Sequence, residues 1–239
     1  MKIIVCKDYD EMSVEAAKIV AAQMKEKKDS ILGLATGSTP LGLYNELVKM
    51  NQSGEIDFSE IKTFNLDEYY PISHKDDQSY YYFMNENLFS RVNIDPANTD
   101  IPNGEAPDAE AECKRYDAAI DASAGVDIQI LGIGQNGHIA FNEASDVLHA
   151  NTHQETLTEN TIQANSRFFE NEEDVPRHAL TMGIGSIMKA RKIILLASGK
   201  NKRDAVRGLI DDTITTQNPA TLLKLHKDVV IICDEEAMG

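Results

Sequence analysis

The sequence predicts an α/β fold in which helices cover both faces of a mostly parallel sheet. Short apolar runs alternate along the chain with polar or glycine-containing turns and helical patterns, as in βαβ units. The runs are nearly continuous in Ile, Val and Leu, which is typical of strands buried on both faces. The 239 residues suit a single domain over 1–239, and no linker or repeat marks a boundary.

Each element is expected from a local pattern. The apolar runs predict strands at residues 3–5, 31–35, 61–66, 126–132, 192–197 and 229–233. Apolar residues at helical spacing, and Pro40 in a first turn, predict helices at residues 11–28, 40–50, 78–89, 109–122 and 201–210. Residues 144–173 form the least regular stretch, long and polar, and we expect a lid there.

The acidic balance of the chain argues against nucleic acid and membrane partners. It has 23 Lys and Arg against 39 Asp and Glu, a formal net charge of -16 at pH 7. An anionic ligand therefore needs a local basic site. No apolar run approaches the roughly 20 residues of a membrane helix, the first residues lack a secretory signal, and Cys6, Cys113 and Cys233 have no metal-like spacing. We expect a cytoplasmic protein with reduced thiols.

The turn after the second expected strand can hold a phosphate. It leads from Thr36 through Gly37, Ser38 and Thr39 into the helix that begins near Pro40. A helix N-terminus offers unpaired N–H groups, Gly37 permits close backbone approach, and hydroxyl groups can donate to phosphate oxygens. The alternative is an ordinary capping turn. The segment matches neither a nucleotide-binding nor a dinucleotide-binding glycine loop.

Two adjacent carboxylates, Asp67 and Glu68, end the third expected strand, at the edge where open α/β sheets bind ligands. Because neighbours on an extended chain point opposite ways, we expect one to face a cleft and the other solvent or a structural partner. A solvated acidic turn is the alternative.

A glycine-rich turn follows the fourth expected strand and carries His138 and Glu143. A lone His beside such a turn is more often structural, but a carboxylate nearby favours catalysis because a catalytic imidazole needs an orienting partner. His149 and His153 lack the flanking pattern of a metal site, so we expect no metal.

Three cations near strand ends are candidate phosphate partners in this acidic protein: Arg167, Lys200 and Lys202. Each alone is more often an ordinary surface charge.

Together these segments resemble the glucosamine-6-phosphate deaminase family over almost the whole chain. The matching blocks are L-A-T-G-S-T-P, F-N-L-D-E-Y-Y, G-I-G-x-N-G-H-I-A-F-N-E, A-N-S-R-F-F, A-L-T-M-G-I-G and V-V-I-I-C-D-E. Each block alone is weak evidence, whereas their number and order are highly specific. The resemblance implies a modified Rossmann-like fold, and conversion of glucosamine 6-phosphate to fructose 6-phosphate and ammonia without metal or organic cofactor.

The resemblance also implies a role for each matching residue. Asp67 matches the general base that moves a proton between C2 and C1 of the sugar. His138 matches the residue that opens the pyranose ring, with Glu143 as its partner and Asn136 as the third member of the group. The positions that match phosphate contacts are Ser38, Thr39, Arg167 and Lys202, of which Lys202 can exchange with Lys200 if the alignment slips.

The chain departs from many family members at two places. Asn136 stands where many have Asp, and an amide orients His138 by hydrogen bonding without stabilising an imidazolium by charge, so the pH profile of ring opening should differ. Allosterically activated relatives have basic residues after the catalytic Glu and a longer C-terminal extension. Residues 145–155 here contain no Lys or Arg. We expect a non-allosteric monomer, with a homo-oligomer left open.

Two other functions compete with this interpretation. A 6-phosphogluconolactonase shares the fold and a glycine-rich loop, but residues 66–69 and 141–143 resemble the deaminases instead. A non-catalytic sugar-phosphate sensor would have lost Asp67 or carry a DNA-binding segment, and neither is seen.

Overall fold

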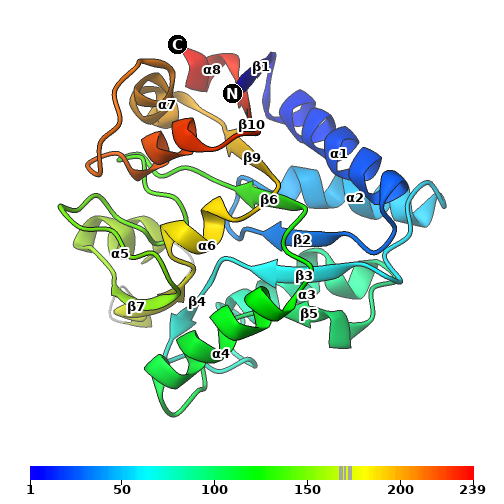
Figure 1. The fold of residues 1–239 in the computed structure, drawn as a ribbon, viewed down its shortest axis with the longest axis horizontal. Helices are drawn as coiled ribbons and strands as arrows, with labels where there is room; N and C mark the ends of the chain where they lie inside the picture. The colour runs from blue at the N-terminus through cyan, green and yellow to red at the C-terminus, as the bar shows by residue number, and fades with distance from the viewer. Residues whose placement is uncertain (167–168, 170, 172–173) are drawn as a thin grey trace.

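A seven-stranded parallel sheet forms the centre of the protein (Figure 1). The structure is a computed structural model that describes residues 1–166, 169, 171 and 174–239. The strands lie in the order β1-β10-β9-β6-β2-β3-β5, and every neighbouring pair is parallel. Their bounds are β1 Lys2–Cys6, β2 Ile31–Leu34, β3 Lys62–Asn65, β5 Thr99–Asp100, β6 Ile128–Leu131, β9 Lys192–Ala197 and β10 Val229–Asp234. The predicted α/β fold class is confirmed.

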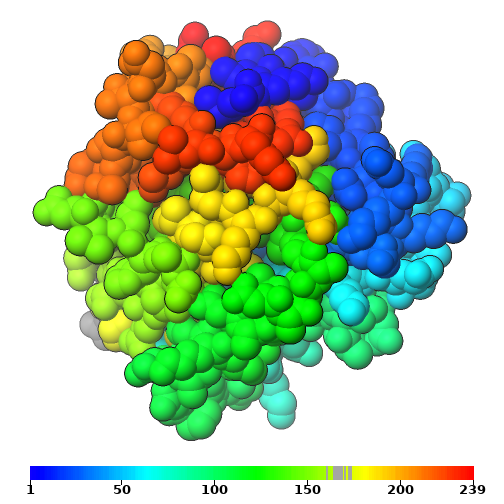
Figure 2. Space-filling model, viewed as in Figure 1, coloured from blue at the N-terminus to red at the C-terminus, as the bar shows by residue number. Residues whose placement is uncertain are grey.

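The direction of each crossover decides which face its helix covers. The chain steps from β1 to β2, β3 and β5, then returns through β6, β9 and β10. Because parallel crossovers are right-handed, the helices of the two halves lie on opposite faces. The first half contains α1 (Tyr9–Glu26), α2 (Leu41–Gln52) and α3 (Tyr80–Asn87), and the second α4 (Ala109–Ala122), α6 (Ile184–Met188) and α7 (Arg203–Ile210). Figure 2 shows α4 in green and α6 in yellow on the face turned to the viewer.

Local side chains set where several helices begin. Asp8, Ser79 and Asp108 each accept a hydrogen bond from a backbone N–H of the first turn of α1, α3 and α4. The last element, α8 (Glu235–Met238), is capped in the same way by Asp234. These caps explain why α1 begins at Tyr9, two residues before the predicted start.

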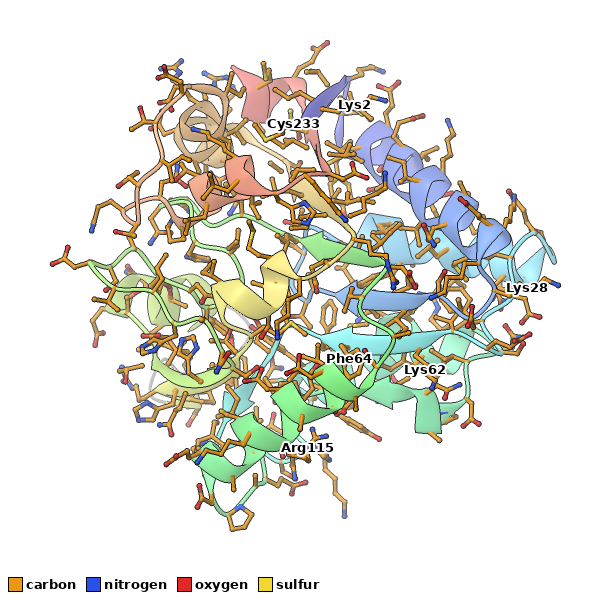
Figure 3. The ribbon with its side chains drawn as sticks, in the orientation of Figure 1. Lys2, Lys28, Lys62, Phe64, Arg115 and Cys233 are labelled. Atoms are coloured by element: carbon orange, nitrogen blue, oxygen red, sulfur yellow. The ribbon has the colours of Figure 1, made fainter. Side chains whose placement is uncertain are left out.

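The main core lies between the sheet and its helices. Phe64 on β3, labelled in Figure 3, packs edge-on against Tyr116 of α4, with ring centroids 6.0 Å apart. The Tyr116 hydroxyl donates to the carbonyl of Asn65 at 2.5 Å, so α4 is fixed against the carboxyl end of β3.

A smaller antiparallel sheet was not predicted from the sequence. Its strands are β4 (Asp67–Tyr70), β8 (His178–Thr181) and β7 (His153–Thr156), in the order β4-β8-β7. With α5 (Glu159–Ser166) it lies on the side of the molecule where the parallel strands end (Figure 1). The expectation that residues 144–173 are irregular was therefore wrong for the part that the structure describes, since β7 and α5 lie in it. The stretch is polar because β7 is half exposed and α5 exposes Glu159 and Gln163 while it buries Thr161 and Ile162.

A crevice is expected where β2 and β6 lie side by side. The connection after β2 leads to one face of the sheet and the connection after β6 to the other. Ligands of open α/β sheets bind at such a switch point, outside the carboxyl ends of the strands. The turns at residues 35–40 and 132–143 are the two connections that meet there.

Within the described ranges, no helix is both long and apolar enough to cross a membrane.

Candidate functional site

A cavity of about 360 Å³ opens at this switch point, and chain segments that follow four strands of the main sheet line it. The first two contribute Gly37, Ser38 and Thr39 after β2, and Asp67 after β3. The others contribute His138 after β6 and Lys202 after β9. The structure thus brings into one cavity residues that the sequence singled out in four separate segments.

The turn after β2 has the geometry of an anion site. Gly37 has φ +89°, a left-handed conformation that favours glycine. Among the described residues, no side chain caps the start of α2. The Tyr9 hydroxyl braces the turn from α1, accepting from the Gly42 N–H at 2.7 Å and donating to the Ser38 carbonyl at 3.0 Å. The remaining first-turn N–H groups of α2 and the hydroxyls of Ser38 and Thr39 can therefore bind an anion.

Of the two candidate lysines, Lys202 lines the cavity beside Asn201. Lys200 instead lies 3.8 Å from the Glu236 carboxylate, and its side chain is 74% exposed. Arg167, the other cation predicted to bind phosphate, lies outside the described residues.

The two adjacent carboxylates are both buried, so the alternative of a solvated acidic turn is wrong. Asp67 faces the cavity, whereas Glu68 points away and accepts from the backbone N–H groups of Tyr69, Tyr80 and Tyr81 at 2.8–2.9 Å. Glu68 thus holds the start of α3, in agreement with the expectation that one of the two carboxylates faces a structural partner. Burial, opposed by these three N–H groups, raises the pKa of Glu68 to about 7.

Burial, and then the charge of Glu68, raise the pKa of Asp67 to about 8. No described side chain donates a hydrogen bond to the Asp67 carboxylate. A carboxylate in this environment binds a proton readily, which is the property that a general base near neutral pH needs.

The small sheet joins Asp67 to the glycine-rich turn. Asp67 pairs with Thr181 in the register of β4 and β8, and the Thr181 hydroxyl accepts from the Phe141 N–H at 3.2 Å. One residue on, Met182 bonds both segments: its N–H donates to the Leu66 carbonyl at 2.8 Å, and its carbonyl accepts from Asn142 Nδ2 at 2.8 Å. Both candidate catalytic segments are therefore fixed to the same strand end.

Asn136, His138 and Glu143 form one group. The Glu143 Oε2 atom lies 3.3 Å from His138 Nδ1 and accepts from Asn136 Nδ2 at 2.8 Å. His138 Nδ1 and Glu143 Oε2 are close enough for an ion pair, but His138 Nδ1 is not aligned for a hydrogen bond with any described residue. Catalytic hydrogen bonds are often loose in this way before a substrate binds. Asn136 Oδ1 accepts from the backbone N–H of His138 at 3.1 Å, so the amide orients the His138 backbone and not its ring.

Glu143 is held in its charged form. Burial alone would raise its pKa, but His138 and the hydrogen bonds from Thr161 and Asn136 lower the pKa of Glu143 to about 2. Glu143 is thus an anion throughout the neutral range and can stabilise a positive charge on His138.

Two cavity residues were missed in the sequence. Tyr80, at the start of α3, lies in the cavity wall, and Thr161 reaches it from α5. The sequence predicted the helix that carries Tyr80 but gave no sign of which of its residues would meet Asp67. Thr161 lies in the stretch that was expected to be irregular.

The described residues contain no group of three or more His, Cys, Asp or Glu side chains that could hold a metal ion. The rings of His149 and His153 do lie together, with centroids 4.4 Å apart.

Comparison with known proteins assigns the family. A family model described as glucosamine-6-phosphate isomerases/6-phosphogluconolactonase matches residues 8–232. The chain belongs to this family. Among its relatives, the glucosamine-6-phosphate deaminase of Clostridium beijerinckii is 59% identical over 236 residues, covering 99% of this chain and 98% of that protein. The deaminase of Clostridioides difficile is 55% identical over 237 residues, covering 99% and 95%.

Solved structures of family members have the same fold. A structure described as a monomeric glucosamine-6-phosphate deaminase is 47% identical, with a TM-score of 0.97 over 99% of this chain and 98% of that one. The 6-phosphogluconolactonase of Thermotoga maritima is 24% identical, with a TM-score of 0.78 over 98% of both chains, and this likeness concerns the fold alone.

Proposed function

We propose that the protein is a glucosamine-6-phosphate deaminase, which converts glucosamine 6-phosphate and water to fructose 6-phosphate and ammonia. The observation that carries this proposal is the single cavity in which an anion-binding turn, Asp67 and His138 meet. Deaminases that are 59% and 55% identical over nearly the whole chain support it.

The substrate's phosphate lies against the turn at Gly37. The first-turn N–H groups of α2, the hydroxyls of Ser38 and Thr39 and the Lys202 ammonium bind it. The proposal includes Arg167 as a further phosphate ligand, on the resemblance of its segment alone. With its anionic end fixed there, the sugar extends across the cavity toward Asp67 and His138.

His138 opens the pyranose ring. It moves a proton between the C1 hydroxyl and the ring oxygen, and the charge that the imidazole carries during this transfer is stabilised by Glu143, 3.3 Å away. Asn136 holds Glu143 and the His138 backbone in place.

Asp67 then moves a proton along the open chain. As a carboxylate it takes the proton from C2 of the aldose and returns it to C1, while a proton moves from the 2-ammonium group to the C1 oxygen, so that C1 becomes a hydroxymethyl group and C2 an iminium. Water adds to this carbon, and the C–N bond breaks to give the ketose and ammonia. The raised pKa of Asp67, about 8, makes its carboxylate basic enough for the first transfer.

A coupled assay tests the function. The purified chain, in buffer containing a chelator, should release ammonia and fructose 6-phosphate in equal amounts from glucosamine 6-phosphate. The Asp67→Asn variant should be at least about 100-fold slower with KM little changed. Hydrolysis of 6-phosphogluconolactone without ammonia release would instead identify a lactonase, and chelator-sensitive turnover would show a metal requirement.

We further propose a cytoplasmic, monomeric and non-allosteric enzyme in which residues 144–173 act as a lid over a single domain of residues 1–239. The monomeric deaminase structure at 47% identity supports the oligomeric state. The absence of Lys and Arg from the sequence of residues 145–155 supports the lack of allostery. Light scattering should give the mass of one chain, 26.5 kDa, and sigmoidal saturation that N-acetylglucosamine 6-phosphate relieves would contradict the proposal.

A further inference from the structure

The Glu143 carboxylate is held from two different parts of the chain. Oε2 accepts from Asn136, on the same turn, and faces His138. Oε1 accepts from the hydroxyl of Thr161, on α5. Among the described residues Thr161 is the one side chain that hydrogen-bonds Oε1.

The donors and acceptors of this contact are mutually consistent. An ionised carboxylate only accepts, so the Thr161 hydroxyl must donate to it. Its oxygen then accepts from the Thr158 hydroxyl at 3.1 Å, and the Thr158 oxygen accepts from the Thr161 N–H at 3.2 Å. Thr158 immediately precedes α5 and caps it, so the cap of α5 and the contact to Glu143 form one hydrogen-bonded chain.

Burial fixes α5 in the position that this contact needs. Ile162, the neighbour of Thr161, is 1% exposed in the small core beneath the second sheet, together with Tyr69 and Phe141. Thr161 itself is 6% exposed, and Glu143 7%. Because water has little access to Glu143, the loss of the Thr161 hydroxyl would leave Oε1 without a donor.

We propose that Thr161 is a positioning residue: its hydroxyl holds Oε1 of Glu143, so that Oε2 faces His138 only while α5 is docked. The bond itself is independent of the reaction, but its catalytic consequence rests on the proposed deaminase function. Without Thr161, the described residues would hold the Glu143 carboxylate only at Oε2, through Asn136. Docking of α5 adds the bond to Oε1 and so completes the ring-opening group.

Three variants test the proposal. Thr161→Val removes the hydroxyl at nearly constant volume, Thr161→Ser keeps it, and Thr156→Val is a matched control on β7 whose side chain is exposed and contacts His178 instead. Thr161→Val should lower kcat roughly tenfold to a hundredfold with KM nearly unchanged, the size expected for a hydrogen bond to a charged group. Thr161→Ser and Thr156→Val should stay near the wild-type kcat. A wild-type kcat in Thr161→Val, or a Thr161→Ser as slow as Thr161→Val, would overturn the proposal.

A double-mutant cycle measures the bond without any turnover. Urea unfolding of wild type, Thr161→Val, Glu143→Leu, which removes both acceptor oxygens, and the double variant should give non-additive changes, with a coupling of about tenfold or more in the unfolding equilibrium constant. Additive changes would overturn the proposal. If the wild type releases no ammonia, the proposed function is wrong, while this cycle still decides whether Thr161 holds Glu143.

Discussion

Replacing Asp67 by Asn should slow turnover and, at the same time, stabilise the folded protein in a pH-dependent way. The Asp67 side chain is buried, and burial together with Glu68 raises its pKa to about 8. In the unfolded chain an Asp has a pKa of about 3.9. The folded protein therefore holds a proton on Asp67 that the unfolded chain has released.

The sign and size of the effect follow from this difference. Between about pH 4 and pH 8 the folded state binds the extra proton, so the free energy of unfolding falls by about 1.4 kcal/mol per pH unit as the pH rises. Below the unfolded pKa this penalty is absent, and above about pH 8 it is complete. Over the whole window it amounts to about 6 kcal/mol. The amide that the variant buries in place of the carboxyl group has its own cost, but that cost does not change with pH.

Urea unfolding of wild type and Asp67→Asn between about pH 5 and pH 8 measures the effect. The difference in unfolding free energy should widen toward pH 8 by about 4 kcal/mol in favour of the variant. Asp77→Asn is the matched control, because Asp77 is exposed. Its difference from wild type should stay nearly constant.

A difference for Asp67→Asn that is the same at about pH 5 and pH 8 would refute the reasoning, since Asp67 would then be ionised in the folded protein throughout. The same titration should shape the activity. Only the carboxylate accepts a proton, so kcat/KM should rise about tenfold per pH unit up to about pH 8 and then level off.

Two further substitutions test residues that position the phosphate turn and the His138 ring. Tyr9→Phe removes the hydroxyl that joins Gly42 and Ser38, and should raise KM about twofold to tenfold with kcat nearly unchanged; the exposed Tyr81→Phe serves as control, and a lowered kcat at wild-type KM would contradict the bracing role. Gly134→Ala would put a Cβ 2.4 Å from the His138 ring and should lower kcat/KM about 100-fold by displacing it, and a wild-type kcat/KM would speak against this displacement.

The parallel sheet was predictable because its strands are buried on both faces. Runs such as residues 192–197 and 229–233 are apolar at almost every position, and each became a strand of the main sheet. β5 escaped prediction because it is only two residues long, Thr99 and Asp100, and pairs at the sheet edge. The small antiparallel sheet escaped because β4 and β7 are rich in polar residues whose burial depends on tertiary contacts.

The site was predictable where backbone geometry decides it and not where packing does. Strand alternation correctly separated Asp67 from Glu68, because it follows from the pleat alone. Alternation could not show that Glu68 would be buried, because the three N–H groups that donate to its carboxylate belong to Tyr69 and to the start of α3. Thr161 was missed for the same reason: its partner Glu143 lies on another turn, and no local pattern marks a threonine that bonds a distant carboxylate.

The two carboxylates of the site differ in surroundings, and this difference separates their roles. Asp67 is buried without a hydrogen-bond donor from any described side chain, and its pKa rises to about 8. Glu143 is nearly as buried, but it accepts hydrogen bonds from Asn136 and Thr161 and lies beside His138, and its pKa falls to about 2. A group that must gain and lose a proton needs the first environment, whereas a group that must stay charged beside an imidazole needs the second. An Asp in place of Asn136 would remove a donor to Glu143 and add a like charge, so the amide at this position favours the charged form of Glu143.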